Sequence, residues 1–343
     1  MGVFDFVKIF RVNKSISIDL GTANILIYDK QKKKIVLNEP SVVAKDRKTG
    51  KLIAVGREAR EMLGKTPDSI QAIKPLQDGV IADIDSTKEM ITYFIHKIYG
   101  NSLFKPEVMI CVPIEVTSVE RKALFDAVKG AKKIYIIEEG RAAIIGSGVD
   151  ISQPEGSMVI DIGGGSTDIA ILSLDEIIAS KSIRIAGNRF DEDIVRYVKR
   201  KYNLLIGDRT AEKIKKEMAT ALKVQSPEVM EIKGRDLESG IPNTVEINAN
   251  EIYEAIEDSL FQIVNSTKEV LEKCPPELAA DILDNGIVMT GGGSLIKNFI
   301  DMMEKEVGIK VFLSPNPLDS VVLGGGAAFD NKKLLRTLQM REN

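Results

Sequence analysis

The feature that most constrains the fold is a sequence motif that occurs twice in the chain. An apolar strand pattern ends in Asp, one apolar residue and Gly, and an alternating pattern resumes after a few small residues. The two copies are SIDLGTANILIY at 17–28 and VIDIGGGSTDIAIL at 159–172. Each copy has the pattern of a β-hairpin with a glycine-rich turn. The repeat predicts two similar α/β lobes, which we expect to face each other across a cleft.

The two turns have the composition of anion-binding loops. Because glycine has no Cβ, it lets backbone N–H groups approach a phosphate closely. A single hairpin of this kind is more often a structural turn, but a matched pair favours a clamp for a polyphosphate. The turn residues are Gly21, Thr22, Ala23 and Asn24 in the first copy and Gly163, Gly164, Gly165, Ser166 and Thr167 in the second.

An aspartate stands at the end of the strand before each turn. A carboxylate repels phosphate, but it can hold the water shell of Mg²⁺, because this ion keeps several of its waters when it binds to proteins. Asp19 and Asp161 are therefore predicted to bind Mg²⁺ through water.

A third glycine-rich turn follows a predicted strand in GIVMTGGGSLI at 286–296. This turn is predicted to open a helix, whose N-terminus would favour an anion, and its backbone could approach a flat ring or a ribose. The residues concerned are Gly291, Gly292, Gly293 and Ser294. The chain has no Gly-x-x-x-x-Gly-Lys-Ser/Thr motif, so it is not a P-loop protein.

Composition narrows the possible function classes. A formal net charge of −3 gives no reason to expect nucleic acid as a partner. The single histidine, His96, and two distant cysteines, Cys111 and Cys274, argue against a Ser-His triad, a Cys-His nucleophile and a structural zinc site. The few cysteines and the lack of a membrane-spanning apolar run favour the reducing cytoplasm.

Periodicity and turn signals outline the remaining elements. Helices are predicted at 87–99, 118–129, 188–203, 208–222, 252–271 (the longest) and 321–330, and strands at 15–28, 35–45, 107–113, 133–139 and 177–187. The stretch 226–246 is strand-like, with turn signals at Lys233-Gly234 and Ser239-Gly240. We expect an amphipathic segment at 1–14, a first lobe at 15–150 completed by a C-terminal helix, a second lobe at 151–330 and a tail at 331–343.

Two apolar segments indicate possible contact with a membrane. In the first segment, 1–14, Phe6 and Phe10 lie with two valines on one face at helical spacing. This segment is either a helix packed on its own domain or a membrane-surface anchor. Leu103 and Phe104 stand together at a predicted loop tip, where they either pack under the loop or form an exposed apolar patch.

Several motifs resemble those of a known superfamily. DLGTAN (19–24), DIGGG (161–165) and TGGG (290–293) resemble the two phosphate motifs and the adenosine motif of the actin/Hsp70/sugar-kinase superfamily. Over 15–329 the chain is similar more narrowly to the bacterial MreB family, through KPLQDGVIADID, LLIGDRTAEKIKKE and GIVMTGGGSLI. The resemblance implies an actin-like (ribonuclease H-like) fold of two lobes and four subdomains around a nucleotide cleft. It also implies ATP or ADP with Mg²⁺ as cofactors, weak ATPase activity and antiparallel double filaments.

The resemblance also assigns roles by position. Asp19 and Asp161 with their adjoining turns would contact phosphates and metal-bound water. Glu212 and Lys215, one helical turn apart, would border the adenosine, and the turn at 291–294 would close its other side. Glu139 would position the water that attacks the γ-phosphate. The alternative for Glu139 is a carboxylate favoured at a helix N-terminus.

The chain departs from the family pattern next to one catalytic candidate, Glu139, and at the other, Ser166. The usual Glu-Glu-Pro-Met is Glu-Glu-Gly-Arg at 138–141, and the usual Gly-Gly-Gly-Thr-Thr-Glu ends in Ser-Thr-Asp at 166–168. Ser166 keeps the hydroxyl but lacks the β-branch that fixes χ1. Gly140 is interpreted as loosening the turn that aims Glu139. We therefore expect slow hydrolysis.

The resulting hypothesis is a cytoplasmic, actin-like ATPase whose homopolymer lies on the inner face of the cytoplasmic membrane and sets cell shape or powers movement. By the resemblance, the loop with Leu103 and Phe104 would insert into the membrane, helped by Phe6 and Phe10. Membrane morphogenesis proteins are further expected partners, and nucleic acid is not. The alternatives are a small-molecule kinase, which would need a substrate pocket and a catalytic base, and a chaperone ATPase, which would need a peptide-binding domain.

Overall fold

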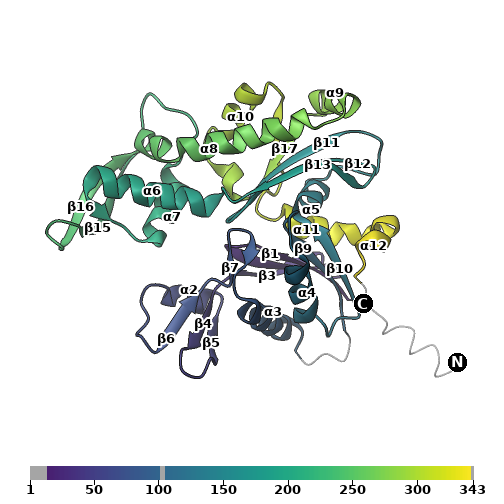
Figure 1. Ribbon diagram of the computed structural model, residues 1–343, viewed down its shortest axis with the longest axis horizontal. Helices are drawn as coiled ribbons and strands as arrows, with labels where there is room; N and C mark the ends of the chain where they lie inside the picture. The colour runs from purple at the N-terminus through teal and green to yellow at the C-terminus, as the bar shows by residue number, and fades with distance from the viewer. Residues whose placement is uncertain (1–13, 101–104, 341–343) are drawn as a thin grey trace. The chain divides into compact units, whose positions relative to one another are not determined.

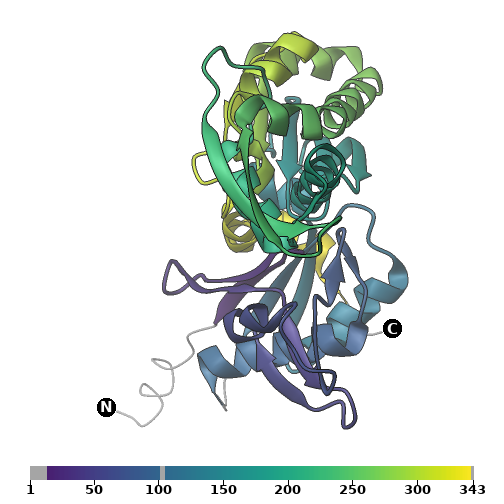
Figure 2. The ribbon, with the colours of Figure 1, turned by 90° about the vertical axis from the view of Figure 1, so that its left-hand side faces the viewer.

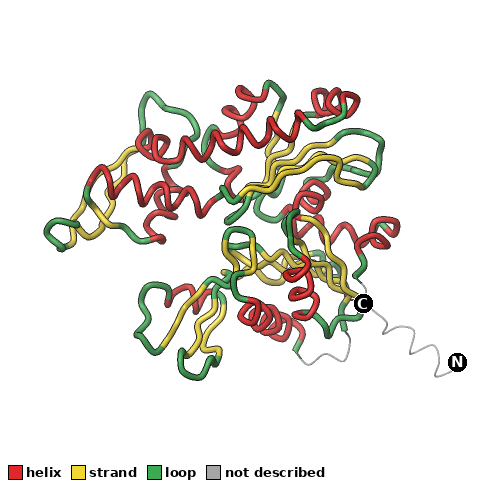
Figure 3. The backbone as a smooth tube through the Cα atoms, viewed as in Figure 1, coloured by secondary structure: helices red, strands yellow, loops and turns green. Residues whose placement is uncertain are grey.

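The structure is a computed structural model that describes residues 14–100 and 105–340 (Figure 1). Its residues group into two compact units. The first combines the chain up to Val112 with Val116–Glu138 and the segment from Val321 onward, and the second combines Pro113–Glu115 with Glu139–Ser320. Each unit is an α/β assembly of its own, with its strands yellow and its helices red in Figure 3.

The first unit is built on a five-stranded sheet with the strand order β10-β9-β1-β2-β3. The first three strands along the chain form an antiparallel meander, and β9 and β10 extend the sheet in parallel from β1. The strands are β1 (Ser15–Leu20), β2 (Asn24–Asp29), β3 (Lys34–Pro40), β9 (Glu107–Val112) and β10 (Lys133–Glu138).

Helices cover both faces of this sheet. On one face, Phe94 of α3 and Leu124 of α4 join a buried core with the apolar side chains of β1, β2 and β9. On the other face lies α11, a helix of small residues from the end of the chain. The helices of this unit are α2 (Arg57–Met62), α3 (Ile84–Tyr99), α4 (Ser118–Ala127), α11 (Ser320–Ala327) and α12 (Lys332–Leu338).

Alternation along β1 decides which side chains meet α11. Ile16 and Ile18 point into the α3 and α4 core. Ser17 points the other way, because a Cβ added at Gly325 of α11 would lie 2.2 Å from Ser17 Oγ. Asp19 has the same parity as Ser17, so the strand directs Asp19 to the α11 face.

The second unit repeats this plan. Its five-stranded sheet has the order β13-β12-β11-β17-β18, again with an antiparallel meander followed by two parallel strands. The strands are β11 (Ser157–Ile162), β12 (Thr167–Ser173), β13 (Glu176–Ile183), β17 (Ile287–Thr290) and β18 (Val311–Leu313). The two predicted hairpins are β1–β2 and β11–β12, at matching places in the two sheets, so the predicted repeat is confirmed.

Helices also cover both faces of the second sheet. Phe190 of α6, Leu260 of α8 and Phe299 of α10 belong to the core on one face. On the other face lies α5, since a Cβ at Gly140 would lie 3.2 Å from Ala170 Cβ of β12. The helices are α5 (Glu139–Gly146), α6 (Gly187–Tyr202), α7 (Asp208–Met218), α8 (Ala249–Glu272), α9 (Pro276–Asn285) and α10 (Phe299–Val307).

Among the described residues, the first unit carries two smaller sheets besides its large one and the second unit carries one. In the first unit these are β4 (Val43–Asp46), β5 (Leu52–Val55) and β6 (Ile70–Ile73), packed on α2, and the short pair β7 (Leu76–Gln77) and β8 (Val80–Ile81). In the second unit they are β14 (Leu204–Leu205), β15 (Val229–Asp236) and β16 (Pro242–Asn248). The β15–β16 hairpin forms the long green ribbon in Figure 2.

Side-chain caps explain where three of the helices begin. The Asp83 carboxylate accepts hydrogen bonds from Ser86 N (2.9 Å) and Ser86 Oγ (2.6 Å), so α3 begins at Ile84, earlier than the predicted start at 87. Capping boxes begin α4, at Thr117, and α8, at Asn248. A polar residue that satisfies free N–H groups thus sets each of these boundaries.

The predicted turn at Lys233-Gly234 is wrong. Both residues lie inside β15 and pair with Thr244 and Asn243 of β16. A Cβ at Gly234 would lie 2.5 Å from the carbonyl oxygen of Leu205, so this glycine lets β14 approach β15. The other predicted turn, at Ser239-Gly240, is confirmed by the positive φ of Gly240 between the two strands.

Three further boundaries differ from prediction. The second unit resumes at Glu139, before the predicted boundary at 150, because α5 packs on β11 and β12. Residues 332–338 of the predicted tail form α12, which packs on β10. The third glycine turn opens a 3₁₀ turn, Gly292–Leu295, and the next α-helix begins only at Phe299.

The predicted membrane residues Phe6, Phe10, Leu103 and Phe104 lie outside the described residues. Among the helices at 14–100 and 105–340, none is long and apolar enough to cross a bilayer.

We expect Gly325→Ala to destabilise the first unit, because the new methyl group would lie 2.2 Å from Ser17 Oγ and 2.9 Å from Cys111 Sγ. Overpacking of this kind costs about 1 to 3 kcal/mol. Urea unfolding would measure the loss, with Gly130→Ala as control, since a Cβ there meets nothing within 4 Å. Adding Ser17→Ala should recover part of the loss. An unchanged midpoint for Gly325→Ala would contradict the packing of α11 on β1.

Candidate functional site

The first glycine turn, 21–23, is held through its carbonyl groups. Ser41 Oγ donates to the Gly21 carbonyl oxygen at 2.6 Å, and Ser41 N donates to that of Ala23 at 3.0 Å. A trans peptide points its N–H away from its C=O. Because Ser41 binds the Gly21 carbonyl, the Thr22 N–H points away from Ser41, where it can donate to a ligand.

Two polar side chains flank this turn. Thr22 is buried, and its Oγ1 accepts a hydrogen bond from Gly79 N at 3.1 Å, so its own proton remains available for donation. Asp19 is half-buried at the end of β1, on the face that α11 covers. Asn24, the last predicted residue of this set, is the first residue of β2 and pairs with Pro40.

The second glycine turn, 163–165, is held in the same way. Gly163 N donates to the Ser166 carbonyl oxygen at 2.9 Å and closes the turn. The first amides of α6 then bind the carbonyls of the turn: Gly187 N donates to Gly163 at 3.1 Å and Asn188 N donates to Gly164 at 2.7 Å. The N–H groups of the following residues therefore point away from α6.

The third glycine turn lies directly against the end of β11. Gly291 has φ +79°, and a Cβ on it would lie 2.3 Å from the Ile162 carbonyl oxygen and 2.5 Å from Asp161 Oδ1. A Cβ on Gly293 would lie 2.2 Å from Ile162 Cγ2. The structure thus brings Asp161, the second turn and the third turn together at one strand end of the second unit.

Ser294 has a structural place in the third turn. Its hydroxyl donates to the Gly291 carbonyl oxygen at 2.6 Å, and its side chain is buried. The Gly291 amide donates to Pro317 at 2.9 Å. These two bonds fix the turn, one from within and one from Pro317, and a four-residue 3₁₀ turn aligns fewer peptide dipoles than the helix predicted there.

The side chains of Glu212 and Lys215 on α7 bind different partners. Glu212 Oε1 accepts a hydrogen bond from the exposed Lys216 at 2.7 Å. Lys215 is mostly buried and reaches the N-terminal turn of α6, where its Nζ donates to the Gly187 carbonyl oxygen at 2.7 Å and to Asp191 Oδ2 at 2.8 Å. These α6 contacts had no signal in the sequence, because they depend on how α6 and α7 pack.

Ser166 and Asp168 form a buried pair beside Asp161. Asp168 is the cross-strand partner of Asp161 and is almost fully buried. Burial raises the pKa of Asp168 to about 6, although hydrogen bonds from Ser182, from Ile114 N (3.3 Å) and from Ser166 oppose the rise. The negative charge of Glu115 adds to it. Sequence reasoning noted Asp168 only as a departure from the family pattern and missed this role.

Glu139 is the first residue of α5 and is half-buried. Its neighbour Gly140 lies within that helix, where a Cβ would meet Ala170 Cβ at 3.2 Å and Ile114 Cδ1 at 3.3 Å. The interpretation of Gly140 as a loosened turn is therefore wrong. This glycine instead lets α5 pack closely on the second sheet.

Among residues 14–100 and 105–340, no group of three or more His, Cys, Asp or Glu side chains could hold a metal ion by itself. Asp19 and Asp161 each offer one carboxylate near a strand end. A hydrated Mg²⁺ would bind such groups through its waters and would take its remaining ligands from water and phosphate.

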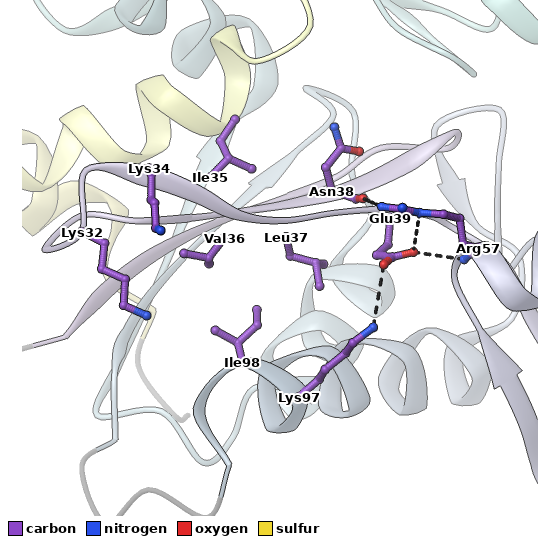
Figure 4. A pocket seen from close by; sticks show the side chains of 10 residues that line it. All are labelled: Lys32, Lys34, Ile35, Val36, Leu37, Asn38, Glu39, Arg57, Lys97 and Ile98. Atoms are coloured by element: carbon purple, nitrogen blue, oxygen red, sulfur yellow. Dashed lines mark hydrogen bonds and ion pairs between the residues drawn. The ribbon is translucent and has the colours of Figure 1, made fainter.

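A groove of about 510 Å³ lies between β3 and α3 in the first unit (Figure 4). None of the predicted site residues lines it. Three of the cations that line it are ion-paired: Glu39 lies 3.5 Å from Arg57 Nε and 3.8 Å from Lys97 Nζ, and Lys32 Nζ lies 3.6 Å from Asp29 Oδ2. These pairs neutralise much of the charge around the groove, which is distinct from the glycine turns.

Comparison with known proteins assigns the family. A family model described as MreB/Mbl protein matches residues 13–337. The chain belongs to the MreB/Mbl family. It is 50% identical to the cell shape-determining protein Mbl of Bacillus subtilis over 321 residues, which cover 93% of this chain and 96% of Mbl. It is 46% identical to the cell shape-determining protein MreB of Escherichia coli over 326 residues, which cover 93% and 94%. The predicted resemblance is confirmed.

Solved structures of similar fold agree with this MreB/Mbl assignment. MreB5 of Spiroplasma citri bound to AMPPNP has a TM-score of 0.89 and 38% identity, covering 94% of this chain and 98% of MreB5. The same protein bound to ADP has a TM-score of 0.88. A MamK double helical filament, at 21% identity and a TM-score of 0.79, shows the fold alone; it covers 93% of this chain and 99% of MamK. The predicted actin-like fold is confirmed.

The raised pKa of Asp168 predicts a pH-dependent stability. Its folded pKa of about 6 exceeds the ordinary 3.8, so the carboxyl group costs stability progressively as pH rises from about 4 to 6. Asp168→Asn removes this cost. We expect the stability of the variant relative to wild type to rise by about 1 to 1.5 kcal/mol between pH 5 and 7.5. Urea unfolding in EDTA at both pH values measures it, and a pH-independent difference would contradict the raised pKa.

Proposed function

We propose that this chain is an actin-like cytoskeletal protein that binds ATP with Mg²⁺, hydrolyses it slowly and polymerises into membrane-associated antiparallel double filaments. The observation that carries the nucleotide assignment is the meeting of Asp161, the second glycine turn and the third glycine turn at the end of β11. The S. citri MreB5 structures bound to ADP and AMPPNP support it further.

The residues present suit a nucleotide with Mg²⁺. The outward N–H groups of the two glycine turns would bind phosphate oxygens, and Asp19 and Asp161 would hold the waters of the metal ion. Glu212, Lys215 and the turn at 291–294 would border the adenosine. When bound, Mg²⁺ neutralises charge on the phosphates. Without a Cβ at Gly291 or Gly293, the third turn approaches the strand end that would carry the metal-bound water.

Hydrolysis would depend on positioning. A water that attacks a phosphoryl group needs an oriented hydrogen-bond acceptor more than a strong base. Glu139 would be this acceptor, from the first turn of α5. The Ser166 hydroxyl, which bonds Asp168, would adjoin the same phosphate. A serine that lacks the β-branch of threonine supports the expectation of slow turnover.

The polymer would act at the inner face of the cytoplasmic membrane. Family membership and the cell shape-determining relatives support self-association and a role in cell shape, with cell movement as the alternative use. Leu103 and Phe104, with Phe6 and Phe10, would supply the apolar membrane contacts, and membrane morphogenesis proteins would be further partners. Flotation of liposomes tests this part, because the polymer alone sediments: an ATP-bound polymer that does not float with the liposomes would contradict it.

The alternatives within the superfamily are a small-molecule kinase and a chaperone-type ATPase. Matches to MreB and Mbl over more than nine-tenths of the chain favour the cytoskeletal function. Sedimentation with ATP separates the three, since only the cytoskeletal protein should pellet as a polymer.

Asp161→Ala should abolish Mg²⁺-dependent ATP binding while the protein stays folded, because Asp161 lies near the end of β11 and its carboxylate would anchor the metal-bound water. Titration of ATP with Mg²⁺ and with EDTA measures the effect. Asp301→Ala, at an exposed position on α10, is the matched control. An ATP affinity that still depends on Mg²⁺ to the same extent in Asp161→Ala would refute the assignment.

Glu139→Ala should lower the rate of phosphate release at least tenfold, which corresponds to about 1.4 kcal/mol of barrier. ATP affinity should change little, because the residue would act on the attacking water. Glu277→Ala, exposed at the start of α9, serves as the control. If phosphate release is indifferent to Glu139, its role is that of a helix N-terminal carboxylate.

A further inference from the structure

Lys215 lies on α7 and contacts the N-terminal end of α6, which holds the second glycine turn. Its ammonium group donates to the Gly187 carbonyl oxygen at 2.7 Å and to Asp191 Oδ2 at 2.8 Å, both on the first turns of α6. The side chains of Lys215 and Asp191 are only 15% and 17% exposed. An ion pair so shielded from water holds its geometry better than an exposed one.

Gly187 is the junction between this ion pair and the turn. Its carbonyl oxygen accepts from Lys215, and its N–H donates to the Gly163 carbonyl oxygen at 3.1 Å. A Cβ on Gly187 would lie 3.3 Å from Lys215 Nζ, 3.4 Å from the Gly163 oxygen and 3.6 Å from Gly164 Cα. The lysine, the first residue of α6 and the glycine turn are therefore packed around one point.

We propose that Lys215 is a positioning residue for the phosphate-binding turn at 163–165. By fixing Gly187 and Asp191, Lys215 sets the N-terminus of α6. The amides of Gly187 and Asn188 then hold the carbonyls of Gly163 and Gly164, so that the following N–H groups face the phosphates. This inference rests on the proposed nucleotide function. It adds that the affinity for phosphate groups depends on Lys215 even when the ligand has no adenine.

Two other roles for Lys215 make different predictions. If Lys215 only contacts adenosine, its loss should not affect a ligand without adenosine. If it only supplies positive charge near the phosphates, removing the negative charge of Asp191 should strengthen the binding of a polyanion. If it positions the turn, losing either partner of the ion pair should weaken phosphate binding. Tripolyphosphate with Mg²⁺ as the ligand therefore distinguishes the three roles.

The experiment measures the affinities of Mg²⁺-ATP and Mg²⁺-tripolyphosphate for the full-length protein by calorimetric titration. We expect Lys215→Met to weaken both ligands at least tenfold, with ATP weakened further to the extent that Lys215 also borders the adenosine, and Asp191→Asn to weaken tripolyphosphate at least threefold. Lys215→Arg, which keeps the charge and the donors, should stay within about threefold of wild type. Lys213→Met removes an exposed lysine from the same helix and should leave both affinities within twofold of wild type.

Two results would overturn the inference while leaving the proposed function intact. One is a Lys215→Met protein that loses ATP affinity but binds tripolyphosphate as wild type does. The other is tighter tripolyphosphate binding by Asp191→Asn, because this variant removes one negative charge and would strengthen binding if Lys215 acted only through its positive charge. A wild-type protein that binds neither ligand would instead refute the proposed function itself, and the inference with it.

Discussion

The candidate site depends on one close approach of backbone to backbone. At the end of β11, the third glycine turn lies so near Ile162 and Asp161 that a single methyl group on Gly291 or Gly293 would overlap their atoms. A clash with a backbone carbonyl cannot be relieved by a change of rotamer, so this contact tolerates almost no variation. The position of Asp161, the entry into the second turn and the path of the third turn all follow from it.

The second turn adds a different kind of constraint. Its carbonyls are satisfied by amides of α6, and α6 is in turn tied to α7 by Lys215. The orientation of a few N–H groups is thus fixed by helices rather than by the turn alone. In the first unit, Ser41 does the equivalent work with one side chain and one amide. The two halves of the repeat hold the carbonyl groups of their turns by different means.

Much of this site was predictable because its signals are local. A strand that ends in Asp-x-Gly and restarts after small residues specifies a hairpin, whatever surrounds it, and the second copy confirmed the reading of the first. The α6 contacts of Lys215 and the close packing of Gly140 were not predicted, because both depend on neighbours from other elements. Asp168 shows the same limit: its position opposite Asp161 follows from the hairpin register, whereas its raised pKa follows from burial in the folded unit, which hydrogen bonds from Ser182, Ile114 N and Ser166 only partly offset.

The route of the chain has a consequence for its synthesis. α5 follows a strand of the first unit but packs in the second, and α11 follows the second unit but covers the Asp19 face of the first sheet. On the ribosome, all residues of the second unit are made before the first unit receives its last helices. Until then the sheet that carries Asp19 keeps one face open, with Ser17 and Cys111 uncovered. The sheet that carries Asp19 and the first glycine turn is therefore translated first but completed last.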